Sequence, residues 1–123
     1  MRKILVIDDH DPWCDNVALE LQKAGHEVIR ARDEAQAVAA ASDERPSLVL
    51  VDLLVAAKAG AGFVRRLRSL PSMRNTPMLL TTAGTNRQVA QHALGQSADE
   101  IITKNKHSMS TIIERLMRLP KAD

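Results

Sequence analysis

Five short apolar runs, separated by longer segments with helical spacing, constrain the fold of this chain more than any other feature. Each run has four to six residues, which is typical of a strand buried in a parallel sheet. The runs are KILVI at 3–7, HEVIRA at 26–31, SLVLV at 47–51, PMLLT at 77–81 and EIIT at 100–103. The run at 26–31 is a weaker strand signal than the first, and we expect it near an edge of the sheet.

The segments between the runs carry apolar residues at spacings of three and four, which predicts helices. We expect a first helix with Asp11 as its N-cap and Pro12 at its first position, and a second helix capped by Asp33. A third is expected from about Ala61 to Pro71, a fourth around Val89, Ala93 and Leu94, and a fifth around Met109, Ile112, Ile113, Leu116 and Met117. Strands that alternate with helices predict an α/β fold, with five helices on the two faces of a five-stranded parallel sheet.

Length and composition are those of one ordinary globular domain, which we place at residues 1–119, with 120–123 as a tail or the start of a linker. The chain has 123 residues, 26% of them charged, and a net charge of +2. Neither a signal peptide nor a membrane span is recognisable, so a cytoplasmic location is the default expectation. Cys14 is the only cysteine, which excludes an internal disulfide. Two aromatic residues and the lack of a G-x-G-x-x-G motif argue against flavin and dinucleotide binding.

Polar residues gather where four of the predicted strands end. These residues are Asp8 and Asp9 after ILVI, Asp52 after LVLV, Thr81 and Thr82 after MLL, and Lys104 after IIT. The carboxyl ends of parallel strands share one edge, and neighbouring strands lie only about 4.8 Å apart, so the three aspartates can converge. Adjacent strand residues point to opposite faces, so only one of the two threonines can face a common site.

Converging carboxylates need a cation. At about 4 Å and an effective dielectric constant near 20, each pair repels by about 4 kcal/mol. Oxygen donors without histidine or cysteine favour a hard ion such as Mg²⁺, and Lys104 adds an ammonium group. A carboxylate held rigidly after the central strand, as Asp52 would be, can attack phosphorus and form an acyl phosphate. Lys104 and Thr82 would then stabilise the phosphoryl group.

A simpler interpretation is that each aspartate forms a turn or caps a helix. Asp11 suits the first cap better than Asp8 or Asp9 does, and Asp52 lies eight residues before Gly60, too far to cap the expected third helix. Because this interpretation must explain each position separately, we favour the shared site.

The same residues, within ILVIDD, LVLVD, TTAG and TK, resemble the receiver domain of two-component response regulators over about residues 3–118. The segments AGHEV, RRLR, NTPMLLTTA and ADEIITK add to the resemblance. It implies the flavodoxin-like, doubly wound fold with strand order 2-1-3-4-5, of which a receiver protein is itself a standard example.

The resemblance also implies a role for each site residue. Asp52 would be the phosphoacceptor, Thr82 the switch hydroxyl and Lys104 the phosphate-binding lysine. Asp9 would bind Mg²⁺ directly, Asp8 would assist through water, and the backbone carbonyl of Leu54 would complete the protein's share of the metal ligands.

The partners implied are a histidine kinase or phosphotransfer protein as phosphoryl donor, and a downstream protein bound through the face formed by helix 4, strand 5 and helix 5. Homodimerisation through that face is left open. We expect no membrane contact, no direct nucleic-acid contact by this domain, and no turnover of an external metabolite.

Three departures from the family pattern affect the switch more than the chemistry. Val55 and Ala56 stand where Met-Pro is common, and the stretch LLVAAKAGAG is expected to be a flexible loop or to pack against a partner. Asn105 follows Lys104 where the family has a proline after a cis bond, so a trans bond and a different placement of Lys104 are expected. Ile101 stands at the aromatic switch position, which predicts an altered coupling to Thr82.

Two other functions compete with phosphorylation-controlled switching. One is a degenerate receiver-like module that binds partners independently of phosphorylation, which the altered switch residues favour. The other is a Mg²⁺ phosphohydrolase, which is weaker because Leu54 stands where the common aspartyl-phosphatase motif has its second acid.

Overall fold

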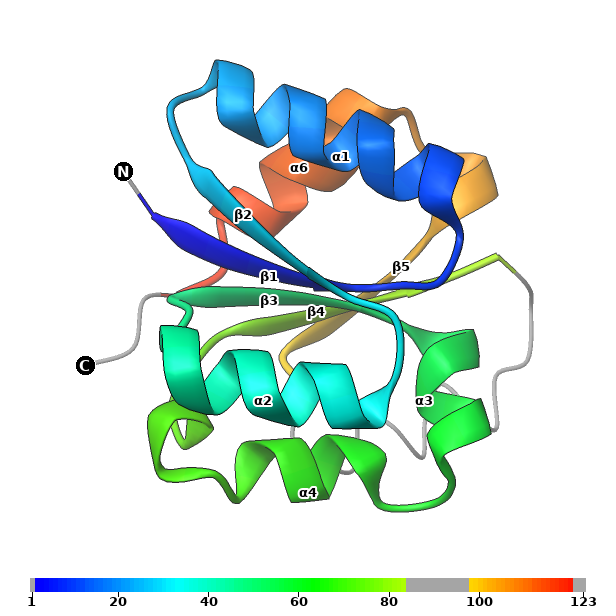
Figure 1. Ribbon diagram of the computed structural model, residues 1–123. Helices are drawn as coiled ribbons and strands as arrows, with labels where there is room; N and C mark the ends of the chain where they lie inside the picture. The colour runs from blue at the N-terminus through cyan, green and yellow to red at the C-terminus, as the bar shows by residue number, and fades with distance from the viewer. Residues whose placement is uncertain (1, 84–97, 121–123) are drawn as a thin grey trace.

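The computed structural model describes residues 2–83 and 98–120 and places five parallel strands in one sheet (Figure 1). The order across the sheet is β2-β1-β3-β4-β5, which confirms the predicted doubly wound, flavodoxin-like topology. The strands are β1 (Lys3–Ile7), β2 (Glu27–Ala31), β3 (Leu48–Asp52), β4 (Met78–Thr82) and β5 (Glu100–Thr103). The expected edge position of the second strand is also confirmed, and β2 is correspondingly only half buried.

Helices cover both faces of this sheet. In Figure 1, α1 (Asp11–Lys23) and α6 (Met109–Met117) lie on one face, and α2 (Glu34–Glu44), α3 (Leu53–Ala59) and α4 (Phe63–Arg68) lie on the other. Two short 3-10 helices, η1 (Pro71–Met73) and η2 (Lys104–Lys106), precede β4 and follow β5. The described ranges contain no helix that is both long enough and apolar enough to cross a membrane.

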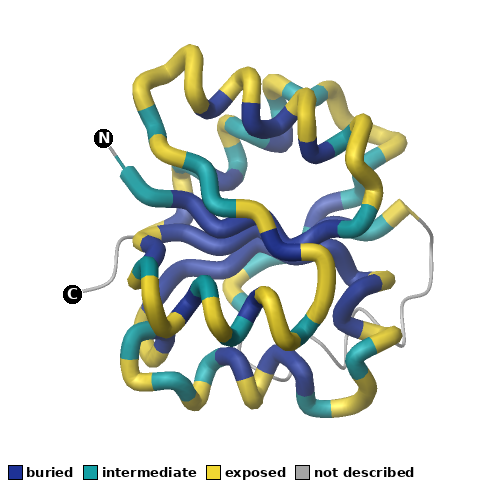
Figure 2. Tube along the Cα trace, viewed as in Figure 1, coloured by how far each residue is buried: buried dark blue, intermediate teal, exposed yellow. Residues whose placement is uncertain are grey.

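Alternating strand residues build the two apolar layers that hold these helices. Leu5, Val51 and Leu80 face the layer beneath α2, α3 and α4, whereas Val6 and Leu50 face the layer beneath α1 and α6. All residues of β3 are buried, as a central strand requires (Figure 2). The carboxyl end of β3, where Asp52 lies, is therefore among the most firmly held points of the fold.

The segment after Asp52 differs from the sequence-based prediction. It is the helix α3, not a flexible loop, and it begins directly after Asp52. Leucine, alanine and lysine favour a helix, and Leu53, Val55 and Ala56 gain burial against the core. The sequence predicted that Asp52 is too far from the next helix to be its N-cap residue. That prediction is wrong, because Asp52 is the N-cap residue of α3. The Asp52 side chain nevertheless makes no capping hydrogen bond.

Glycine ends this extra helix and permits the turn into the next one. Gly60 and Gly62 have φ angles of +100° and +89°, a region that side chains rarely adopt. A Cβ atom on Gly62 would also lie 3.1 Å from the guanidinium of Arg66. The predicted third helix consequently appears as α4, which begins at Phe63.

The predicted helix caps are confirmed at one position and shifted at another. Asp33 caps α2, since its carboxylate accepts a hydrogen bond of 2.8 Å from the backbone N–H of Gln36. The N-cap of α1 is His10 instead of Asp11, because the Asp11 carboxylate pairs with Arg32. The predicted fifth helix is α6, and the fourth, around Val89, Ala93 and Leu94, lies outside the described residues.

Candidate functional site

Strand register brings the predicted polar residues to one edge of the sheet. Ile7 pairs with Val51, so Asp8 and Asp52 leave adjacent strands at the same level. Asp52 in turn pairs with Thr81 on β4. Thr82 pairs with Thr103 on β5, the residue directly before Lys104. Side chains that are separated by up to 96 positions in the sequence thus meet beyond the ends of four parallel strands.

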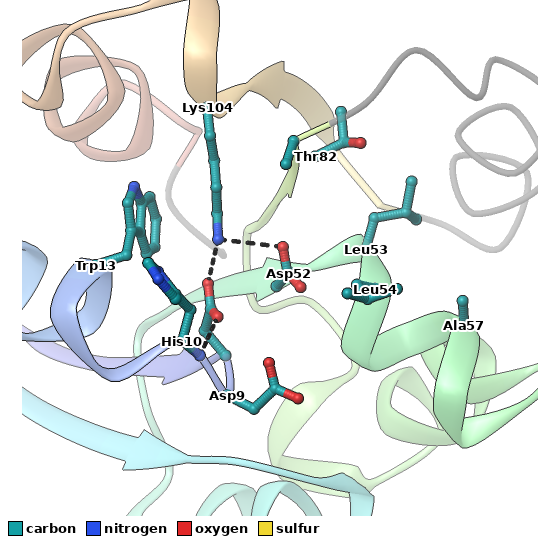
Figure 3. Close-up of a pocket in the computed structure, with 11 residues that line it drawn as sticks. Asp9, His10, Trp13, Asp52, Leu53, Leu54, Ala57, Thr82 and Lys104 are labelled. Atoms are coloured by element: carbon teal, nitrogen blue, oxygen red, sulfur yellow. Dashed lines mark hydrogen bonds and ion pairs between the residues drawn. The ribbon is translucent and has the colours of Figure 1, made fainter.

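Lys104 bridges two of the three aspartates. Its Nζ atom lies 2.6 Å from Oδ2 of Asp8 and 3.2 Å from Oδ1 of Asp52, and in Figure 3 it extends from above toward Asp52. These side chains are deeply placed: Asp8, Asp52 and Lys104 are 1%, 7% and 12% exposed. The backbone N–H of His10 also donates a hydrogen bond of 2.9 Å to Asp8. The expected trans bond after Lys104 is confirmed, because the described residues contain no cis peptide bond. The expected different placement of Lys104 is not found, since its ammonium reaches both Asp8 and Asp52.

The third aspartate has a different cation. Lys58, on α3, places its Nζ atom 2.9 Å from Oδ2 of Asp9. This pair is much more accessible, since the Lys58 side chain is 61% exposed and that of Asp9 is 31% exposed. The hydrogen bond that Lys58 donates to Asp9 holds the pKa of Asp9 below the ordinary aspartate value.

The three carboxylates are close enough to share one metal ion. One oxygen from each of Asp8, Asp9 and Asp52 lies within 4.8 Å of the others. Ligand atoms at about 2.0–2.6 Å on opposite sides of a hard cation are about 4–5 Å apart, so the spacing fits Mg²⁺ or Ca²⁺. Asp9 and Asp52 are therefore close enough to bind a common ion, as the predicted convergence of the three aspartates requires.

These side chains line one open pocket of about 860 Å³. Thr82 and Leu54 also line it, and both are labelled in Figure 3. The hydroxyl of Thr81 instead donates a hydrogen bond of 3.4 Å to the backbone carbonyl of buried Val51, which confirms that only one threonine faces the pocket. The expected metal contact of the Leu54 carbonyl stays a prediction.

Burial and neighbouring charges act in opposite directions on Asp52. Desolvation raises the pKa of its carboxyl group, the Lys104 ammonium lowers it, and the nearby Asp8 carboxylate raises it again. The net effect is a pKa above the ordinary aspartate value. Burial therefore disfavours the charged form of Asp52, and a cation bound nearby would favour it.

Sequence reasoning missed two contributors to this site. Neither Trp13 nor Lys58 is among the residues that the sequence analysis placed at this site. The Lys104 ammonium lies over the face of the Trp13 ring, 4.0 Å from the ring centroid, and Figure 3 shows Trp13 beside the Lys104 side chain. Their positions in the sequence could have indicated this role. Trp13 lies in the first turn of the helix that follows Asp9, and Lys58 lies six residues after Asp52.

Comparisons with known proteins agree with this geometry. The family model of the response regulator receiver domain matches residues 4–116. The phosphate regulon transcriptional regulatory protein PhoB of Pseudomonas aeruginosa is 31% identical over 103 residues, which are 84% of this chain and 45% of that protein. The chain thus spans about half the length of the curated relatives it matches.

Solved structures show the same fold. The chemotaxis protein CheY4 of Vibrio cholerae has a TM-score of 0.86 and 28% identity, with 98% of this chain and 99% of that chain covered. A response regulator protein of Burkholderia pseudomallei, solved with a phosphorylated aspartic acid and a calcium ion, has a TM-score of 0.82 and 23% identity. That match covers 94% of this chain and 66% of the other. The family model matches nearly the whole length of this chain, and the chain has the fold of that family. The chain therefore belongs to the response regulator receiver domains of two-component systems.

Proposed function

We propose that this receiver domain is phosphorylated on Asp52 and that phosphorylation switches its contacts with other proteins. The donor would be a phosphohistidine on a partner histidine kinase or phosphotransfer protein, acting in the cytoplasm. The observation that carries the proposal is the bridge from Lys104 to Asp8 and Asp52. It places a cation between two buried carboxylates, and the third carboxylate, that of Asp9, lines the same pocket.

In the proposed reaction, a carboxylate oxygen of Asp52 attacks the phosphorus atom of the phosphohistidine. The new bond is an acyl phosphate O–P bond, the P–N bond breaks, and the imidazole leaves with the electron pair of that bond. Lys104 would move its ammonium contact from Asp52 to the phosphoryl oxygens, because it already lies 3.2 Å from the attacking group. Thr82, at the pocket wall, would donate a hydrogen bond from its hydroxyl group to a phosphoryl oxygen.

The donor set fits Mg²⁺ as the cofactor. Asp9 and Asp52 would bind the ion directly, Asp8 would act through water, and the Leu54 carbonyl would add a further ligand. When bound, Mg²⁺ supplies positive charge that neutralises the phosphoryl oxygens. Asp8 is engaged by Lys104 and by the backbone N–H of His10, which supports an indirect role for it.

The output is proposed to be protein contact and not the turnover of a metabolite. Its expected surface is the face that includes β5 and α6, where a downstream protein or a second copy of the domain would bind. The fourth helix of that face falls within 84–97, outside the described residues. The chain spans about half the length of its curated relatives, so the activity and partners of those whole proteins are not assigned to this chain.

One observation favours a second function, phosphorylation-independent binding. Ile101 stands at the aromatic switch position on β5 and packs, partly buried, against the core layer beneath α2 and α4. Its side chain has no polar group that water could stabilise if the side chain moved into solvent. A domain without that relay could contact its partner in the same way whether or not Asp52 is modified.

Incubation with acetyl phosphate and Mg²⁺, followed by intact mass measurement, tests the main proposal. We expect one phosphoryl group on the wild type, removed by hydroxylamine, and none on Asp52→Asn. An unmodified wild type would contradict the proposal. Mg²⁺-dependent binding of beryllofluoride, a phosphoryl mimic, would separate the functions: partner affinity that changes with it supports switching, and unchanged affinity supports the second function.

A further inference from the structure

Lys58 is a second internal cation at the acidic cluster. It lies on α3 at helical spacing from Leu54 and beside Ala57, both of which line the pocket, so this side of the helix faces the site. Its ammonium contacts Asp9, the aspartate that Lys104 does not reach. Asp9 is also the most accessible of the three carboxylates, and it is therefore where an ion from solvent would first bind.

The charges at the cluster favour exchange of Lys58 for a metal ion. With all five groups ionised, Asp8, Asp9 and Asp52 with Lys104 and Lys58 carry one net negative charge. A divalent cation added beside both lysines would make the cluster positive by one unit. The same cation in place of Lys58 would make it neutral. Replacement is therefore electrostatically preferred to addition.

The two lysines also differ in how firmly they are held. Lys104 is 12% exposed, bridges two buried carboxylates and lies over the Trp13 ring. Lys58 is 61% exposed and contacts one carboxylate that is itself partly open to solvent. An exposed ion pair of this kind is weak and is easily exchanged.

We propose that Lys58 occupies the Asp9 carboxylate as a built-in competitor and is displaced when a divalent metal ion binds. This rests on the proposed function, because it assumes that the cluster is a metal site. Lys58 thereby sets the metal affinity of this domain below what its three carboxylates alone would give. Metal binding also releases Lys58, near the end of α3, from its contact with Asp9.

Mg²⁺ titration of the wild type, Lys58→Met and Lys58→Arg tests this competition. Trp13 is the only tryptophan of the chain and lines the pocket, so its fluorescence reports binding, with calorimetry as a second measurement. We expect Lys58→Met to bind Mg²⁺ about two- to fivefold more tightly, the factor that corresponds to an exposed ion pair. Lys58→Arg should stay near the wild type. The difference should shrink at high salt, since an exposed pair is screened.

Lys106→Met is the matched control, because Lys106 is an exposed lysine at the same end of the molecule and its loss removes the same charge. An equal gain in affinity for Lys106→Met would overturn the inference, because general electrostatics would then explain the effect. Equal affinity of the wild type and Lys58→Met would overturn it as well, while leaving the metal site intact. If no variant bound Mg²⁺, the proposed function and this inference would both fail.

Release of Lys58 can be measured directly. The labelling rate of its amine by an N-hydroxysuccinimide ester, followed by mass spectrometry, should rise when Mg²⁺ is added. The labelling rate of Lys106 should not change. A Lys58 rate that is unaffected by saturating Mg²⁺ would show that the ion pair persists beside the metal, and it would overturn the displacement.

Discussion

Removal of the Lys104 ammonium should destabilise the metal-free domain far more than removal of the Lys58 ammonium, although both contact the same acidic cluster. In Lys104→Met, the buried carboxylates of Asp8 and Asp52 lose their shared cation. Their oxygens lie within 4.8 Å, where two like charges repel by about 3.5 kcal/mol at an effective dielectric constant near 20. Stranding a buried charge commonly costs about 3–5 kcal/mol. We therefore expect a loss of about 3 kcal/mol in the free energy of unfolding at pH 7.

The matched variant Lys58→Met should lose less than about 1 kcal/mol, because that ion pair is exposed. Urea unfolding in EDTA, followed by circular dichroism, gives both values. A third variant isolates the cause: in an Asp52→Asn background, only Asp8 is left without its cation. Lys104→Met should then cost about half as much, and the difference is the coupling energy between Lys104 and Asp52.

The pH dependence provides an independent check. The pKa of Asp52 is raised in the folded state, and removal of the ammonium raises it further. Between the unfolded and folded pKa values, the folded protein binds more protons than the unfolded chain does, so stability from this group rises as the pH falls. The deficit of Lys104→Met should consequently shrink on acidification from pH 7. Equal losses for the two lysine variants, or a deficit that grows on acidification, would refute the reasoning.

Three further predictions concern single positions. Asp52→Asn should raise the metal-free stability at pH 7 by about 1 kcal/mol in urea unfolding, since it removes a buried charge beside Asp8, and a loss would contradict this. Asp33→Ala should cost about 1 kcal/mol in the same assay through loss of the α2 cap, whereas Ser42→Ala, at an exposed site in that helix, should not destabilise. Trp13→Leu should slow phosphorylation by acetyl phosphate about two- to fivefold and Trp13→Phe should restore most of the rate, because an aromatic face favours the Lys104 ammonium; leucine and phenylalanine variants of equal rate would count against this.

The strands and the gathering of polar groups were predictable because both follow from local patterns. Short apolar runs such as ILVI and LVLV are typical of strands in a buried parallel sheet, and the carboxyl ends of parallel strands lie at one edge. Asp8, Asp52 and Lys104 therefore meet for reasons that are visible in the sequence. The Asp33 cap was predictable for a similar reason, since its contact lies three residues away.

The sequence-based prediction was wrong for the stretch after Asp52, where a weak preference for a helix competes with a weak preference for a loop. The stretch after Asp52 contains good helix formers, but Gly60 and Gly62 follow closely, and a seven-residue helix is marginal on its own. Burial of Leu53, Val55 and Ala56 against the sheet decides in favour of α3, and that burial is a tertiary effect. The contact of the Asp11 carboxylate with Arg32 is likewise tertiary, and local sequence patterns do not reveal it.

The difference between the two lysines explains how one cluster can be both stable and exchangeable. Lys104 neutralises the buried pair of carboxylates, and no small ion could replace it without a desolvation cost of several kcal/mol. Lys58 neutralises the accessible carboxylate, where water can solvate both partners after they separate. Of the two lysines, Lys104 therefore contributes more to fold stability, and displacement of a lysine by a solvent ion is confined to Lys58 at the end of α3. A domain with both lysines buried would resist the metal, and one with both exposed would leave Asp8 and Asp52 to repel each other.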